Sequence, residues 1–135
     1  MENNKVFLPM KTPMITCYPP IANLFSMLEC HDFAYPWLFS NFIQIYSYRF
    51  RKQFELLMPE GFEAMRLCPW LNCSLLDRDI VFSLHEELLD FLILSIYKGS
   101  YIYCVGDISC FSQLNVPPVP HDMFIYGYDI EVVLH

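Results

Sequence analysis

The sequence predicts an α+β fold, in which an N-terminal helical half is followed by a small antiparallel sheet. Apolar residues recur at the spacing of a helix face in three segments within about residues 19–98, and runs rich in β-forming residues follow over about residues 101–135. The 135 residues contain no repeat, no low-complexity segment and no glycine-serine linker. We therefore expect a single domain over residues 1–135.

The first two helices are predicted from prolines and from the apolar residues that follow them. Pro19 and Pro20 suit the first turn of a helix, where a missing N–H group costs little. Pro36 begins a longer second helix, and the basic segment Arg49–Lys52 suits its C-terminal dipole end. The expected apolar faces are Ile21, Leu24, Phe25 and Leu28 in the first helix, and Phe39, Phe42, Ile43, Tyr46 and Phe50 in the second. Prolines and a glycine break up residues 57–79, which predicts loops or short helical turns there.

A third helix is predicted from start and stop signals. Ser83 with Glu86 three residues later forms a capping box, and Lys98-Gly99 is a typical helix end. Its expected core face is Leu84, Leu88, Phe91, Leu92 and Ile96.

Strands are expected after this helix. Tyr101–Val105 is rich in β formers, and a second strand begins at Pro120, beyond a proline-rich loop. A third run, Glu131–Leu134, is expected to pair with the second across a turn at Asp129-Ile130. Three consecutive strands at the end of the chain give the antiparallel sheet.

Composition excludes some classes of function. The net charge of −7 leaves no basic stripe for nucleic acid. Hydrophobic residues make up 55% and charged residues 17%, below the usual ~25%, so we expect a large core or an exposed aromatic patch that a partner covers. No segment reaches a membrane span of ~20 apolar residues and no signal peptide is recognisable, which predicts a cytoplasmic protein with its six cysteines reduced.

His121 is the first candidate for chemistry, because it lies where a loop meets an apolar strand. A general base is often held in this way, although an exposed histidine bonded to a backbone carbonyl is the alternative. Cys17, just before the first helix, is the candidate nucleophile, since a helix dipole lowers a thiol pKa. The alternative is a buried cysteine, because Pro19 and Pro20 remove two N–H donors from that helix end.

Three acidic residues support this candidate site. They are Asp107, Asp122 and Asp129, all beside the expected strands. For Asp107 a structural role is expected, in which its carboxylate accepts hydrogen bonds from loop N–H groups. The cysteine spacing does not match a zinc site and no phosphate-binding glycine loop exists, so we predict no metal and no cofactor.

Two segments carry a resemblance to a known family. They are Tyr97-Lys98-Gly99-Ser100-Tyr101-Ile102-Tyr103-Cys104-Val105-Gly106-Asp107 and Pro120-His121-Asp122-Met123-Phe124-Ile125-Tyr126-Gly127-Tyr128-Asp129. Together they resemble the papain-like proteins grouped with the N-terminal domain of the butirosin-pathway acyltransferase, and more loosely bacteriocin-processing cysteine peptidases. Tyr18–Leu24, Tyr35–Trp37 and Asn41–Gln44 are similar to the helical half of the same group.

The resemblance implies a papain-like fold in peptide natural-product biosynthesis in bacteria. It places His121 on the catalytic histidine of the family and Cys17 near the nucleophile. The third catalytic residue of the family is expected just beyond Leu134, so the resemblance implies a truncated last strand. A non-catalytic protein that binds a peptide, acyl-carrier or protein partner is therefore the first hypothesis. A cysteine acyltransferase or peptidase using Cys17 and His121 is the alternative. A small-toxin immunity protein would fit the acidity, but no motif supports it.

Overall fold

The chain folds as two compact units, residues 10–74 and residues 1–9 with 75–135. The computed structural model describes residues 4–16, 18–42, 45–48, 53–56, 63–84, 87–110 and 116–130. The prediction of a single domain over residues 1–135 stays a prediction.

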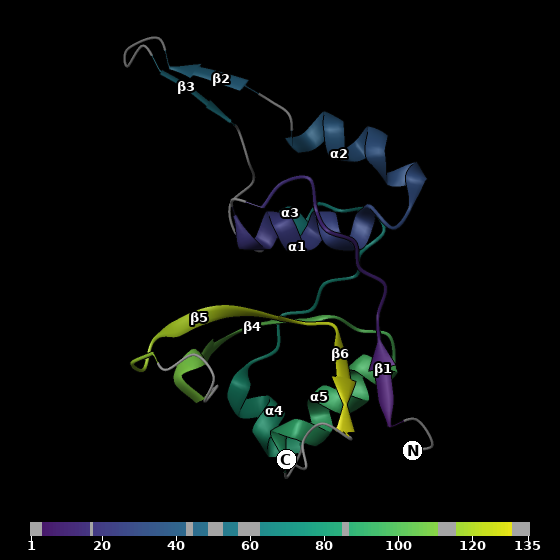
Figure 1. Ribbon diagram of the computed structural model, residues 1–135, viewed down its shortest axis with the longest axis vertical. Helices are drawn as coiled ribbons and strands as arrows, with labels where there is room; N and C mark the ends of the chain where they lie inside the picture. Colours follow the sequence, from purple (N-terminus) through teal and green to yellow (C-terminus); the bar gives the residue numbers. More distant parts are fainter. Residues whose placement is uncertain are drawn as a thin grey trace. The chain divides into compact units, whose positions relative to one another are not determined.

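The described residues form a mixture of helices and short antiparallel strands, which confirms the α+β class (Figure 1). In residues 10–74 the elements are α1 (Pro19–Leu28), η1 (Asp32–Ala34), α2 (Tyr35–Phe42), β2 (Ile45–Tyr48), β3 (Gln53–Leu56) and α3 (Glu63–Arg66). The other unit holds β1 (Lys5–Phe7), α4 (Arg78–Leu84), α5 (Leu88–Tyr97), β4 (Ile102–Asp107), η2 (Ile108–Cys110), β5 (Pro120–Ile125) and β6 (Gly127–Asp129). No helix among these is long and apolar enough to cross a membrane.

Helix α1 is the centre of the core in residues 10–74. Pro19 and Pro20 begin it as predicted, and the four apolar residues of the expected face are buried. It packs beside α3, whose Ala64 and Met65 are also buried. The buried carboxylate of Glu29, just after α1, accepts a hydrogen bond of 3.0 Å from the Met14 N–H, and this bond ties the preceding segment to the helix.

The second helix was predicted to continue beyond Phe42 as far as Phe50, and this prediction is wrong. Helix α2 ends at Phe42, and β2 pairs with β3 as an antiparallel hairpin, with Ile45 opposite Leu56. Near the helix end, Ser40 and Asn41 each donate a side-chain hydrogen bond of 2.8 Å to the carbonyl four residues earlier, a contact that competes with regular helix. Strand-forming Ile45, Tyr46 and Tyr48 follow, so the apolar residues also fit a strand. Ile43 and the segment 49–52 lie outside the described residues.

The third helix is split, and its capping box is wrong. Ser83 lies in the last turn of α4. Its hydroxyl donates a hydrogen bond of 2.7 Å to the Ile80 carbonyl, whereas a capping residue would accept one from the N–H of a later residue. Helix α5 begins after Glu87, whose side chain makes no capping bond, and Glu86 lies outside the described residues. The helix end predicted at Lys98-Gly99 is confirmed. Gly99 has φ +87°, and its N–H donates a hydrogen bond of 2.9 Å to the Ile96 carbonyl. The Ser100 N–H donates a second hydrogen bond of 2.9 Å to the Ser95 carbonyl. Together these features form a Schellman motif at the helix end.

Strands β4 and β5 pair antiparallel, as expected for the predicted sheet, but the turn predicted at Asp129-Ile130 is wrong. β4 pairs with β5, from Ile102 opposite Ile125 to Asp107 opposite Pro120. β6 pairs instead with N-terminal β1, so Asp129 is a strand residue opposite Lys5 and not part of a turn. Strands β1, β2 and β3 all precede α3, so the order of helices first and strands last is wrong. The predicted strand Glu131–Leu134 lies outside the described residues.

Candidate functional site

His121 is an exposed residue of β5, directly opposite Gly106 of β4. Its Nδ1 lies 3.0 Å from the backbone carbonyl oxygen of Asp122. Because a carbonyl only accepts, Nδ1 is the donor in this contact, and Nε2 is left as the nitrogen with a free lone pair. The imidazole therefore has one nitrogen that can take a proton or bind a metal ion.

Asp122 cannot orient this imidazole through its carboxylate. Neighbouring residues of a strand point to opposite faces, so His121 and Asp122 project to different sides of the β4–β5 pair. Asp107 shares the face of Asp122, because it lies opposite Pro120. The structure thus brings three predicted site residues to one end of the strand pair but divides them between its two faces.

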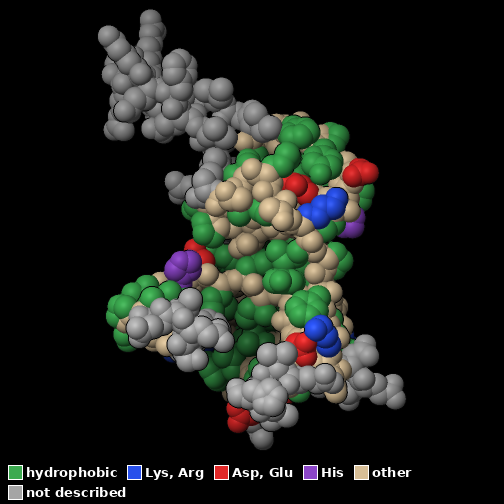
Figure 2. Space-filling view, in the orientation of Figure 1, with side chains coloured by type: hydrophobic (Ala, Val, Ile, Leu, Met, Phe, Trp, Pro, Cys, Tyr) green, Lys and Arg blue, Asp and Glu red, His purple; other side chains and the backbone are tan. Residues whose placement is uncertain are grey.

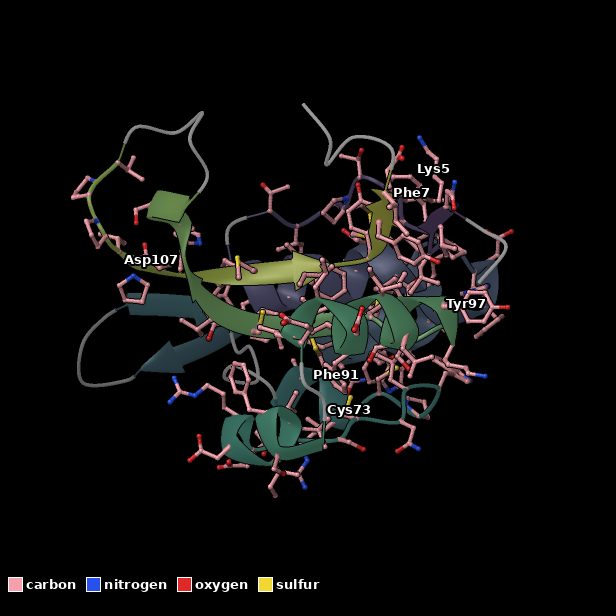
Figure 3. The ribbon with its side chains drawn as sticks, turned by 90° about the horizontal axis from the view of Figure 1, so that it is seen from below. Lys5, Phe7, Cys73, Phe91, Tyr97 and Asp107 are labelled. Carbon is pink, nitrogen blue, oxygen red and sulfur yellow. The ribbon has the colours of Figure 1, made fainter. Side chains whose placement is uncertain are left out.

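Asp107 has the structural role that was expected. Its Oδ1 accepts hydrogen bonds from the N–H groups of Ser109, at 2.9 Å, and Val119, at 3.3 Å. Hydrogen bonds from Ser109 and then Val119 lower the pKa of this exposed carboxyl below its ordinary value. The carboxylate therefore closes the loop between β4 and β5. In Figure 3 it lies at the far end of this unit from Lys5 and Phe7.

Asp129 also has a structural partner. Its Oδ2 lies 2.5 Å from Nζ of Lys5, the residue directly opposite on β1, and the Lys5 ammonium lies 5.2 Å from the Phe7 ring centroid. This ion pair holds the short β1–β6 pair in register. It belongs to a different strand pair from His121, which lies at the start of β5.

The predicted nucleophile, Cys17, lies outside the described residues. Burial raises the pKa of Cys68, Cys73 and Cys104, so these three side chains are neutral thiols near pH 7 and weak nucleophiles. Within the described part of the chain, no group of three or more His, Cys, Asp or Glu side chains is arranged to hold a metal ion.

Two sulfur side chains share the His121 face of the strand pair. Met123 is two residues further along β5, and Cys104 lies directly opposite Met123 on β4. Both are half-buried, whereas His121 is exposed. Sequence reasoning missed this group because it depends on the register between β4 and β5. The alternation of His121 and Met123 along one strand was the available signal.

A second group, in residues 10–74, is aromatic. His31 stacks on Phe33 with ring centroids 5.3 Å apart, and Phe33 meets Trp70 edge to face at 5.0 Å. Trp70 contacts Trp37 at 5.9 Å, and Trp37 contacts the fully buried Phe42 at 5.5 Å. We call His31, Phe33, Trp37 and Trp70 the aromatic surface, since Phe33 is 58% and Trp70 46% exposed. An exposed aromatic patch was one of the two alternatives that the composition predicted, but the composition did not indicate which rings would meet.

Comparison with known proteins found no matching family model, curated protein or solved structure. The papain-like resemblance is therefore still a prediction.

Proposed function

We propose that this protein is a non-catalytic binding protein, which takes up apolar side chains of a peptide or protein partner on its aromatic surface. The observation that carries the proposal is the unbroken chain of ring contacts from exposed Phe33, through Trp70 and Trp37, to buried Phe42. Papain-like architecture and a role in peptide natural-product biosynthesis belong to the same proposal. They are supported by the two C-terminal segments that resemble that family.

The ring contacts favour binding because they hold exposed aromatic groups in place before a partner arrives. Trp and Tyr are enriched among the residues that dominate protein interfaces, and rings fixed in advance lose less entropy on binding. Figure 2 shows hydrophobic side chains on the surface of each unit. Trp70 and Phe33 are therefore the expected anchors of the interface.

The charge of this unit favours a partner that is apolar rather than strongly charged. Residues 10–74 contain five basic and five acidic residues, so their net charge is zero. Among the described residues of this unit, only Lys11 and Arg66 are basic, and a phosphate-rich partner would need a larger basic surface.

The test is selection of peptides from a displayed random library on the folded protein, followed by titration with a selected peptide. Both tryptophans of the chain belong to the aromatic surface, so intrinsic fluorescence reports on it directly. Phe33→Ala is expected to weaken binding at least about tenfold, as for a residue that dominates an interface. Phe82→Ala, in the other unit and similarly exposed, is the matched control. Equal affinities of the two variants would refute the proposal.

A cysteine acyltransferase or peptidase is the second candidate, favoured by the free Nε2 of His121. In this reaction His121 would take the proton of Cys17 as the thiolate attacks an acyl carbon. The rate of alkylation of Cys17 by iodoacetamide, measured against pH in the parent protein and in His121→Ala, decides between the two. A fast reaction below pH 7 that is lost in His121→Ala supports the enzyme, and an ordinary thiol profile excludes it.

A further inference from the structure

Three side chains with metal-binding atoms share one face of the β4–β5 pair. They are the imidazole of His121, the thioether of Met123 and the thiol of Cys104. His121 and Met123 alternate along β5, and Cys104 is directly opposite Met123. Side chains directly opposite in an antiparallel pair have Cβ atoms about 5 Å apart, and diagonal neighbours about 7–8 Å. The three donors are therefore close enough to converge on one ion.

Gly106 makes room for the thioether between the other two donors. It lies opposite His121 and two residues from Cys104. A Cβ added to Gly106 would collide with the Met123 methyl group and would lie 3.2 Å from Met123 Sδ. The Met123 side chain thus bends over Gly106 towards the His121 position, and only a residue without a side chain allows this.

The donors are available for a ligand. Cys104 is a free thiol, and His121 uses only Nδ1, in its contact with the Asp122 carbonyl. The exposed imidazole can turn about its Cα–Cβ bond to direct Nε2 to the sulfur atoms. Met123 and Cys104 are half-buried, which shields a metal–sulfur bond from water while His121 stays open to solvent for exchange of the ion.

We propose that His121, Met123 and Cys104 form a binding site for monovalent copper. Thiolate and thioether sulfur are soft donors that select Cu(I), and imidazole also suits copper. Zn²⁺ is bound by cysteine, histidine and carboxylate, not by thioether, and the described residues hold no group of three such side chains. On binding, the Cys104 thiol loses its proton to solvent and the thiolate takes the ion, with no change of oxidation state.

The test is a titration of the whole protein with Cu(I), without oxygen, in competition with the chromogenic chelator bicinchoninate. Ag(I) is used in parallel for NMR of proteins with labelled methionine methyl groups. The Met123 methyl signal, identified by its loss in Met123→Leu, is expected to shift within the first equivalent. The signal of Met14, which is exposed in the other unit, should stay in place. Changes around a metal site typically cost about 10- to 100-fold in affinity, so Met123→Leu and His121→Gln should each weaken Cu(I) binding at least about tenfold.

The control is Met14→Leu, which makes the same chemical change at a methionine outside the site and should leave the affinity unchanged. The other cysteines can also bind Cu(I), so affinity in the parent protein alone does not decide. A Met123 methyl signal that stays in place while Ag(I) binds would overturn the proposal. So would an unchanged affinity for Cu(I) in folded Met123→Leu and His121→Gln. If a variant fails to fold, judged by circular dichroism, the Met123 signal of the parent protein decides. The result is independent of peptide binding at the aromatic surface.

Discussion

Residues 10–74 and the unit formed by residues 1–9 and 75–135 are held together in different ways. Among the described residues, eleven apolar side chains besides Pro20 are buried in the first unit, and only Val81 and Ile96 in the second. The second unit instead relies on antiparallel strand pairing, the Lys5–Asp129 ion pair and the loop contacts of Asp107. One unit is therefore stabilised mainly by packing and the other by backbone hydrogen bonds and polar contacts.

Charge separates the two units as well. The second unit has three basic and ten acidic residues, a net charge of −7, which equals the charge of the whole chain. It also exposes large apolar side chains, among them Leu75, Ile80 and Leu89. The composition of the whole chain therefore averages over two different units. One is neutral and well packed, and the other is acidic, with few buried apolar side chains among its described residues.

Removal of a core ring is the largest expected effect and tests this comparison. Phe42→Ala should lower the free energy of unfolding by about 3–5 kcal/mol, because Phe42 is fully buried against Phe25 and Trp37. Phe82→Ala, at a half-exposed position of the second unit, should cost less than about 1 kcal/mol. Urea denaturation followed by circular dichroism measures both. Equal losses would mean that the second unit also depends on packing.

Two glycines of the second unit give the next largest effect. A Cβ at Gly127 would lie 2.7 Å from the Val6 carbonyl oxygen and would collide with the Phe7 ring, so Gly127→Ala must force β1 and β6 apart at a cost of about 1–3 kcal/mol. Gly106→Ala meets only the flexible end of Met123 and should cost less. Hydrogen exchange of the Leu8 and Ile130 N–H groups, which bond across the strand pair, should accelerate only in Gly127→Ala. Acceleration in both variants, or in neither, would contradict this difference.

The acid titration of Asp107 is the smallest expected effect. Its pKa is lowered in the folded protein, so the carboxylate stabilises the fold above the unfolded pKa, near 4, and this contribution is lost as pH falls through the lower folded value. The Ser109 N–H makes the largest contribution to the lowered pKa and the Ser109 hydroxyl the second largest, so Ser109→Ala, which removes only the hydroxyl, should move the Asp107 pKa upward. NMR titration of the carboxyl carbon measures the shift. An unchanged pKa in Ser109→Ala would assign the effect to the backbone N–H groups alone.

Sequence patterns predicted local structure correctly where the residues of a segment suited only one backbone structure. The prolines and apolar spacing of α1, the Gly99 helix end and the hydrogen bonding of Asp107 were all recognisable, because each depends on residues close together in the chain. The predictions were wrong where apolar residues suited two structures. The segment after Phe42 fits a helix face by spacing and a strand by composition, and the structure has the hairpin β2–β3.

The sequence by itself determined the α+β class, the acidity, the first helix and the candidate role of His121 as a base. The tertiary structure decided which residues lie beside it. The pairing of β4 with β5 separates His121 from the carboxylates of Asp107 and Asp122 and places Cys104 and Met123 on its face. Helix and loop packing likewise joined Phe33, Trp37 and Trp70. Spacing along a chain specifies local backbone structure, but strand register and side-chain packing join residues distant in sequence, and these depend on the whole fold.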